Sequence, residues 1–212
     1  KKSMEINDAG YTFSQGLEEL RNEIVKKYEN DYGVIILPEQ VLVSNGSSLL
    51  LYLAIRILAP PGSQVILTDP CYACYENVVR LAGSEPVMVK LRHEDGFQLN
   101  VDDLKKRVTP KTRAILINSP MNPTGVVFSS EVMKAIAELD IPVISDEIYA
   151  DLSFEDPPCS FLSYSPQTVA IHGFSKSYAM TGWRLGYLIT PLEWMSAADR
   201  LHQNLMISAT EF

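Results

Sequence analysis

Short apolar segments rich in β-branched residues alternate with segments of helical periodicity along this chain. The apolar segments have the length and composition of buried strands and are bounded by glycine, proline or polar residues; they are 40–46, 64–70, 85–91, 113–120, 141–149, 167–174 and 184–190. The stretches between them place apolar residues at helical spacing; they are 16–33, 47–62, 75–84, 100–108, 129–140 and 191–206. This alternation predicts an α/β fold, a three-layer α/β/α sandwich around a mostly parallel sheet.

The composition excludes several classes of function. Apolar residues make up 46% of the chain, which is enough for a core, and 26 acidic against 18 basic residues give a net charge of −8. That charge disfavours binding to nucleic acids or anionic membranes. There is no apolar run of the ~18 residues that a membrane span needs, and the N-terminal residues lack the apolar region of a signal peptide. We expect a soluble, cytoplasmic protein that binds neither nucleic acid nor membranes.

The cysteines fit the same expectation. Three cysteines, an odd number, are more typical of a reducing compartment than of a disulfide scaffold. Cys71 and Cys74 form a CxxC pair, but no second cysteine pair or nearby histidine completes a zinc site. We therefore expect free thiols and no metal.

Polar residues of chemical interest follow most of the predicted strands. They fall in the groups 46–48, 69–72, 118–125, 146–149 and 173–176. Ligands of parallel α/β sheets bind outside the carboxyl ends of the strands. The sequence therefore predicts a single site to which all these groups contribute.

The segment "HGFSKSYAMTGWRLGY", residues 172–187, carries a candidate nucleophile. A lysine amine such as that of Lys176 attacks carbonyls when desolvation or a nearby cation keeps it neutral. Arg184 and the hydroxyls of Ser175 and Ser177 suit a phosphate. A lysine beside a phosphate pocket indicates pyridoxal phosphate, which has both an aldehyde and a phosphate. A solvated lysine in a turn is the alternative.

The segment "SNGSS" supplies a second candidate for the phosphate. A strand, a glycine turn at Gly46 and a helix N-terminus present free backbone N–H groups to an anion, and Ser47 and Ser48 add hydroxyls. An ordinary helix cap is the alternative.

The segment "VISDEIY" places an acid at the carboxyl edge of the sheet. Asp146 there is a candidate partner for the protonated ring nitrogen of the cofactor, a pairing that lets the ring accept negative charge. Strand alternation points Glu147 the other way. A solvated acid at a strand end is the alternative.

Two further segments offer contacts to the cofactor ring. In "NSPMNPTG", Asn122 lies between two X–Pro bonds, a setting in which cis bonds form, and its amide can donate to a ring hydroxyl. In "PCYACY", Tyr72 can stack on an aromatic ring. A simple turn and a core aromatic are the alternatives.

Taken together, these segments resemble a known family. "GYTFSQGLEELR", "SNGSS", "PGSQVILTDPCYACY", "NSPMNPTG", "SDEIY" and "FSKSYAMTGWRLGY" span roughly residues 10–210 in the order found in the fold-type I pyridoxal-phosphate enzymes, class I/II aminotransferases. The resemblance implies that residues 1–212 are a nearly complete cofactor-binding large domain and that the small domain is missing.

The resemblance also implies a role for each matching residue. It makes Lys176, Asp146 and Tyr149 catalytic: Lys176 forms a Schiff base with the cofactor and moves the substrate proton, Asp146 pairs with the ring nitrogen, and Tyr149 bonds the phenolic oxygen together with Asn122. It assigns the remaining contacts to Tyr72 for the ring and to the residues of the phosphate pocket, which are Gly46, Ser47, Ser48, Ser175 and Arg184.

The implied assembly is a homodimer in which Tyr11 reaches the phosphate of the neighbouring subunit. The implied reaction moves an amino group between an amino acid and a 2-oxo acid. Two alternatives share the same constellation: a carbon–sulfur lyase or other fold-type I lyase, and a non-catalytic sensor domain of a regulator. The arginine that holds the substrate carboxylate in the family has no counterpart here, so the substrate is left open.

Overall fold

The computed structural model describes residues 10–153 and 159–210, within which seven strands form one sheet in the order β1-β7-β6-β5-β4-β2-β3. The strands are β1 (Val41–Ser44), β2 (Gln64–Asp69), β3 (Glu85–Lys90), β4 (Thr112–Asn118), β5 (Val143–Asp146), β6 (Thr168–Gly173) and β7 (Gly186–Ile189). β7 pairs antiparallel with both β1 and β6, whereas the pairs from β6 to β3 are parallel. The prediction of a mostly parallel sheet is confirmed.

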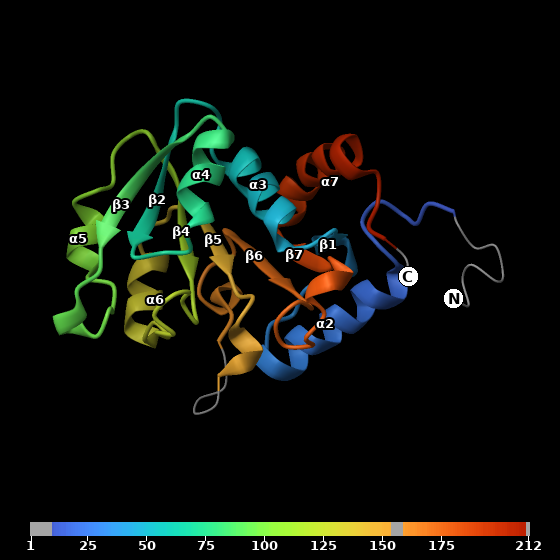
Figure 1. The fold of residues 1–212 in the computed structure, drawn as a ribbon, viewed down its shortest axis with the longest axis horizontal. Coiled ribbons are helices and arrows are strands. Elements are labelled where there is room, and N and C mark those ends of the chain that lie inside the picture. The colour runs from blue at the N-terminus through green and yellow to red at the C-terminus, as the bar shows by residue number, and fades with distance from the viewer. Residues whose placement is uncertain (1–9, 154–158, 211–212) are drawn as a thin grey trace.

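Helices cover both faces of the sheet (Figure 1). They are α2 (Glu18–Tyr32), α3 (Ser47–Leu58), α4 (Cys74–Leu81), α5 (Val101–Lys105), α6 (Ser130–Ala137) and α7 (Leu192–Met206). Figure 1 shows α3, α4 and α7 along one side of the sheet and α2 and α6 along the other. The three-layer sandwich predicted from the alternation is therefore confirmed.

Local chemistry explains where these helices begin and end. α2 ends at Gly33, which adopts a left-handed φ of 65° and donates its N–H to the Glu29 carbonyl. α6 begins after Ser129, whose hydroxyl accepts the N–H of Val132. Both ends lie close to the boundaries that the sequence pattern predicts.

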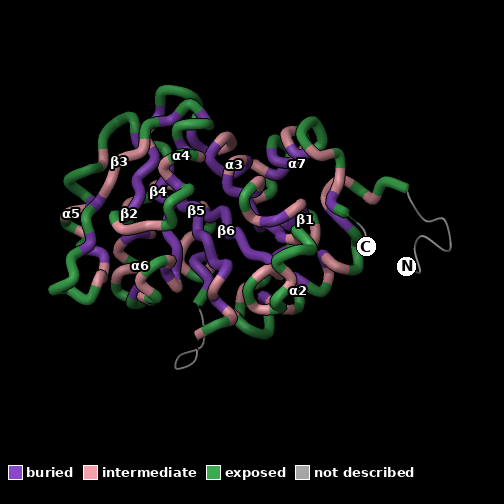
Figure 2. Tube along the Cα trace, in the orientation of Figure 1, coloured by how far each residue is buried: buried purple, intermediate pink, exposed green. Residues whose placement is uncertain are grey.

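The core divides into layers on the two sides of the sheet. Leu116 and Ile144 pack with α3, α4 and α7 on one face, while Ile115 and Val143 pack with α5 and α6 on the other. A third cluster joins α2 to the β1–β7 end of the sheet. Figure 2 shows the strands buried between helices that expose their outer sides. No helix among the described residues is long and apolar enough to cross a membrane.

Candidate active site

A cavity of about 340 Å³ lies where the parallel strands end. Its lining comes from segments far apart in the sequence and consists of Ser47, Ser48, Tyr72, Tyr75, Asn118, Asn122, Asp146, Ile148, Tyr149, Ser175, Lys176, Thr181 and Arg184. All the residues predicted for the site are in this lining except Gly46, which borders it, and Tyr11. The convergence follows from the parallel strands, whose carboxyl ends share one edge.

Asp146 is held rigidly at the end of β5. The Tyr75 hydroxyl donates to its Oδ2 at 2.6 Å, and the Ile148 N–H donates to its Oδ1 at 3.2 Å. Burial raises the pKa of Asp146, although both hydrogen bonds and the charge of Lys176 act in the opposite direction. No basic side chain of the described residues forms an ion pair with it. A protonated ring nitrogen would supply the missing positive partner, so this carboxyl fits the cofactor.

A hydrogen-bonded chain connects the acid to the other side of the cavity. The Asn118 amide donates to the Asp146 carbonyl at 2.9 Å, and the Asn118 Oδ1 accepts the N–H of Asn122 at 2.7 Å. The Asn122 amide in turn donates to the Tyr149 hydroxyl at 3.4 Å, and Lys176 Nζ lies 5.6 Å from the centroid of the Tyr149 ring. The amine, the phenol and the amide therefore face one space.

The prolines beside Asn122 and the Tyr72 ring complete the surroundings of these hydrogen bonds. The bonds before Pro120 and Pro123 are both cis, as the sequence context suggested. Tyr72 is partly exposed at the edge of the cavity, and its ring meets that of Tyr75 edge to face at 5.4 Å. Its position in the cavity lining is compatible with the predicted stacking on a flat ligand.

The residues predicted to bind the phosphate lie together at the start of α3. Gly46 precedes the helix with a φ of 91°, and no side chain caps the N–H groups of the first turn. A Cβ on Gly46 would lie 2.7 Å from Nη2 of Arg184, so the guanidinium packs directly on the glycine. Free N–H groups, two serine hydroxyls and an arginine form a donor set that fits a phosphate dianion.

We expect Gly46→Ala to weaken the binding of pyridoxal phosphate about tenfold by pushing the Arg184 guanidinium away from the pocket. Gly62→Ala is the matched control, because Gly62 has a similar φ of 86° but no atom within 4 Å of its added Cβ. The control therefore shares the positive φ but not the contact with Arg184. Absorbance titration with the cofactor measures the affinity, and equal losses in the two variants would contradict a role for the contact with Arg184.

Four lining residues were not singled out from the sequence: Tyr75, Asn118, Ile148 and Thr181. Asn118 falls in one of the polar groups that follow predicted strands, so its position was a usable signal. Tyr75 lies on a helix, and its contact with Asp146 spans 71 residues, which no local pattern reveals.

Glu147 points away from the cavity, as strand alternation predicted. Its carboxylate is buried and accepts hydrogen bonds from the Ser145 hydroxyl, the Ser160 hydroxyl, the Phe161 N–H and the Tyr28 hydroxyl. Burial nevertheless raises the pKa of Glu147 to about 7.

The raised pKa of Glu147 predicts that the free energy of unfolding depends on pH. The folded protein binds this proton more tightly than the unfolded chain, whose pKa is near 4.5, so the contribution is present at low pH and lost as the pH rises through about 7. We expect the unfolding free energy to fall by up to about 3 kcal/mol relative to Glu147→Gln between about pH 5 and pH 8. Urea unfolding at several pH values measures this, with the exposed Glu138→Gln as control. A difference independent of pH would show that the carboxyl has an ordinary pKa.

Tyr11 lies outside the cavity and is 81% exposed. A single chain does not test whether it reaches the site of a neighbouring subunit, so that role stays a prediction. Cys71, Cys74 and Cys159 are free thiols.

Comparison with known proteins identifies the family. A sequence model of the family described as aminotransferase class I and II matches residues 3–211. The chain belongs to this family. It is a pyridoxal-phosphate-dependent family, so the resemblance noted in the sequence is confirmed.

Named relatives agree with this assignment. The chain is 40% identical to a (5-formylfuran-3-yl)methyl phosphate transaminase of Methanocaldococcus jannaschii over 98% of its own length and 55% of the relative. It is 38% identical to an aspartate aminotransferase of Geobacillus stearothermophilus, over 94% of this chain and 53% of that protein. The solved structure of Thermus thermophilus aspartate aminotransferase with maleate superposes with a TM-score of 0.94 at 32% identity, covering 98% of this chain and 56% of the other. The chain thus spans about half the length of the relatives it matches.

Proposed function

We propose that this chain is the cofactor-binding large domain of an aminotransferase that moves an amino group between an amino acid and a 2-oxo acid. One observation carries the proposal: Lys176, Asp146 and the pocket at Gly46 and Arg184 meet around one cavity of about 340 Å³. The relatives named above are all aminotransferases or transaminases, which favours this reaction over a lyase or a sensor.

Each residue of the site has a distinct role in this proposal. Pyridoxal phosphate, when bound, supplies an aldehyde for attachment and a ring that accepts electrons. Lys176 would hold it covalently through its side-chain amine, and the same amine, when free, would accept the proton of the substrate α-carbon. Asp146 would keep the ring nitrogen protonated, and Tyr149 with Asn122 would hold the phenolic oxygen. The start of α3 and Arg184 bind the phosphate.

The same reasoning leads to proposals for the oligomeric state and the cellular location. We propose a homodimer in which the exposed Tyr11 contributes to the neighbouring site. We also propose a cytoplasmic location, since three free thiols are typical of reducing compartments.

A half-reaction tests the function and separates it from elimination. The purified chain is loaded with pyridoxal phosphate and mixed with single amino acids, without an acceptor. We expect one equivalent of 2-oxo acid per site, no free ammonia, and recovery of the starting absorbance when 2-oxoglutarate is added. Continuous release of ammonia without an acceptor would instead identify a lyase. A loaded site that converts no amino acid to its 2-oxo acid would contradict the aminotransferase proposal.

A further inference from the structure

A group of polar side chains lies outside the cavity, between α2 and the end of β6. We call it the Asp151 cluster; it consists of Lys27, Tyr32, Asp151, His172 and Ser177. Lys27 Nζ lies 2.8 Å from Asp151 Oδ1, and the Tyr32 hydroxyl donates to the same oxygen at 3.2 Å. His172 Nε2 lies 3.5 Å from Asp151 Oδ2. The hydroxyl of Ser177 is buried close to this carboxyl and forms no hydrogen bond with the described residues.

Asp151 connects the two segments that carry the proposed chemistry. It lies two residues after Tyr149, in the short helix η3 (Ala150–Leu152). On the other side it contacts His172, at the end of β6, and faces Ser177, the residue that follows Lys176. Its ion pair with Lys27 connects the segments of Tyr149 and Lys176 to α2. Its own side chain is 17% exposed and does not line the cavity.

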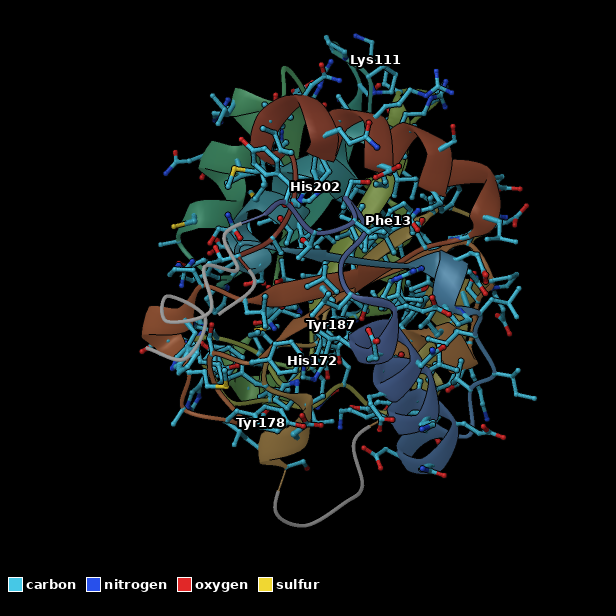
Figure 3. All side chains as sticks on the ribbon, turned by 90° about the vertical axis from the view of Figure 1, so that its right-hand side faces the viewer. Phe13, Lys111, His172, Tyr178, Tyr187 and His202 are labelled. Carbon is cyan, nitrogen blue, oxygen red and sulfur yellow. The ribbon has the colours of Figure 1, made fainter. Side chains whose placement is uncertain are left out.

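The hydrogen bonds of His172 determine which way its proton points. The Gly173 N–H donates to His172 Nδ1 at 2.7 Å, a shorter contact than the 3.2 Å between Nδ1 and the Gly173 carbonyl, which favours the neutral tautomer with its proton on Nε2, 3.5 Å from Asp151 Oδ2. Burial lowers the pKa of His172, which keeps the ring neutral. The ring stacks on Tyr187 with a centroid distance of 5.4 Å and an interplanar angle of 6° (Figure 3).

The stacked pair lies next to the phosphate pocket. His172 and Tyr187 are partners in the β6–β7 ladder, and the next pair along is Gly173 with Gly186. A Cβ on Gly186 would lie 2.9 Å from the backbone nitrogen of Ser47, the first residue of α3. The histidine that contacts Asp151 therefore belongs to the same packed unit as the backbone that holds the pocket.

Asp151 is an anion at neutral pH. Burial by itself would raise the pKa of its carboxyl, but the hydrogen bond from Lys27 and the charge of Lys27 hold the pKa below its ordinary value. Asp31 shares the Lys27 ammonium at 2.6 Å and balances its charge from the exposed side.

We propose that Asp151 is a positioning residue, which fixes the Lys176 loop against the turn of Tyr149 so that the lysine amine meets the cofactor aldehyde in the reactive orientation. The inference rests on the proposed function. It predicts that loss of the Asp151 charge slows the reaction of Lys176 with pyridoxal phosphate, because small displacements of a reacting group cost large factors in rate. A merely structural cluster would lower stability and leave that rate unchanged.

The test compares Asp151→Asn with Asp31→Asn, which removes an acid from the same lysine but touches neither loop. The chain without cofactor is mixed with pyridoxal phosphate, and the Lys176 adduct is trapped with borohydride at timed intervals and counted by mass spectrometry. Thermal unfolding of each variant is measured alongside. We expect Asp151→Asn to slow adduct formation about tenfold or more, and Asp31→Asn to leave the rate within about twofold.

A second variant covers the case in which Asp151→Asn does not fold. Ser177→Ala deletes only the hydroxyl next to the lysine, and we expect adduct formation to slow severalfold with a normal unfolding temperature. Wild-type rates in the folded variants, with lower unfolding temperatures alone, would overturn the positioning role while leaving the proposed function intact. A wild-type chain that forms no Lys176 adduct would contradict the proposed function and this inference together.

Discussion

Lys176→Ala is expected to abolish covalent attachment of pyridoxal phosphate and to lower turnover by about 10⁴-fold or more, because one amine serves both as the nucleophile and as the proton carrier. The fold should survive the change. The Lys176 ammonium lies over the Tyr149 ring at 5.6 Å and forms no ion pair within the described ranges. Absorbance in the visible region, loss of the borohydride-trapped adduct and an unfolding temperature within a few degrees of wild type check the expectation.

The control is Lys111→Ala. Lys111 is exposed and precedes β4, at the edge of the sheet opposite the cavity, so its loss should leave both attachment and stability unchanged. A Lys176→Ala chain that fails to fold would make this lysine structural. An adduct that persists on another lysine would show that the nucleophile had been assigned wrongly.

The sequence predicted the layers of the fold because hydrophobic periodicity is a local property. All seven strands and the six α-helices match segments of the predicted kind, and β5 differs most: residues 141–149 were expected to form a strand, but only Val143–Asp146 do. The direction of β7 was not predictable in this way. An antiparallel strand buried on both faces has the same apolar pattern as a parallel one, and the loop that reverses the chain is the one that carries Lys176.

The candidate site was predictable to the extent that it depends on strand ends. Asp146 and Asn122 follow strands, so the topological rule brought them together without any knowledge of contacts. Tyr75 and the Asp151 cluster depend instead on tertiary packing. The contact between Lys27 and Asp151 spans 124 residues, and neither residue has a local pattern that distinguishes it from a solvated charge.

Replacing the Asp146 carboxylate should have opposite effects on the stability of the cofactor-free protein and on its turnover. Burial raises its pKa in the folded chain, so the ionised form costs stability as the pH rises above the ordinary value of 3.8. In Asp146→Asn an uncharged amide replaces that carboxylate; its oxygen can still accept the Ile148 N–H while its NH2 donates to the Tyr75 hydroxyl oxygen. Without cofactor, we expect the variant to unfold at the same temperature as wild type or higher near pH 7, with the advantage shrinking as the pH falls.

Activity should change in the opposite direction. Without the carboxylate, no group holds a proton on the cofactor's ring nitrogen, and removing a preorganised charge of this kind costs about 10²- to 10³-fold in turnover. The half-reaction with an amino acid measures that loss, and thermal unfolding of the cofactor-free protein at several pH values measures the stability. The exposed Asp95→Asn is the control and should leave turnover unchanged. If Asp146→Asn loses turnover but keeps or raises its unfolding temperature, the Asp146 carboxylate serves catalysis and lowers the stability of the folded protein. Full turnover in Asp146→Asn would show that the carboxylate has no catalytic role. A large drop in unfolding temperature would show instead that Asp146 is needed for the fold.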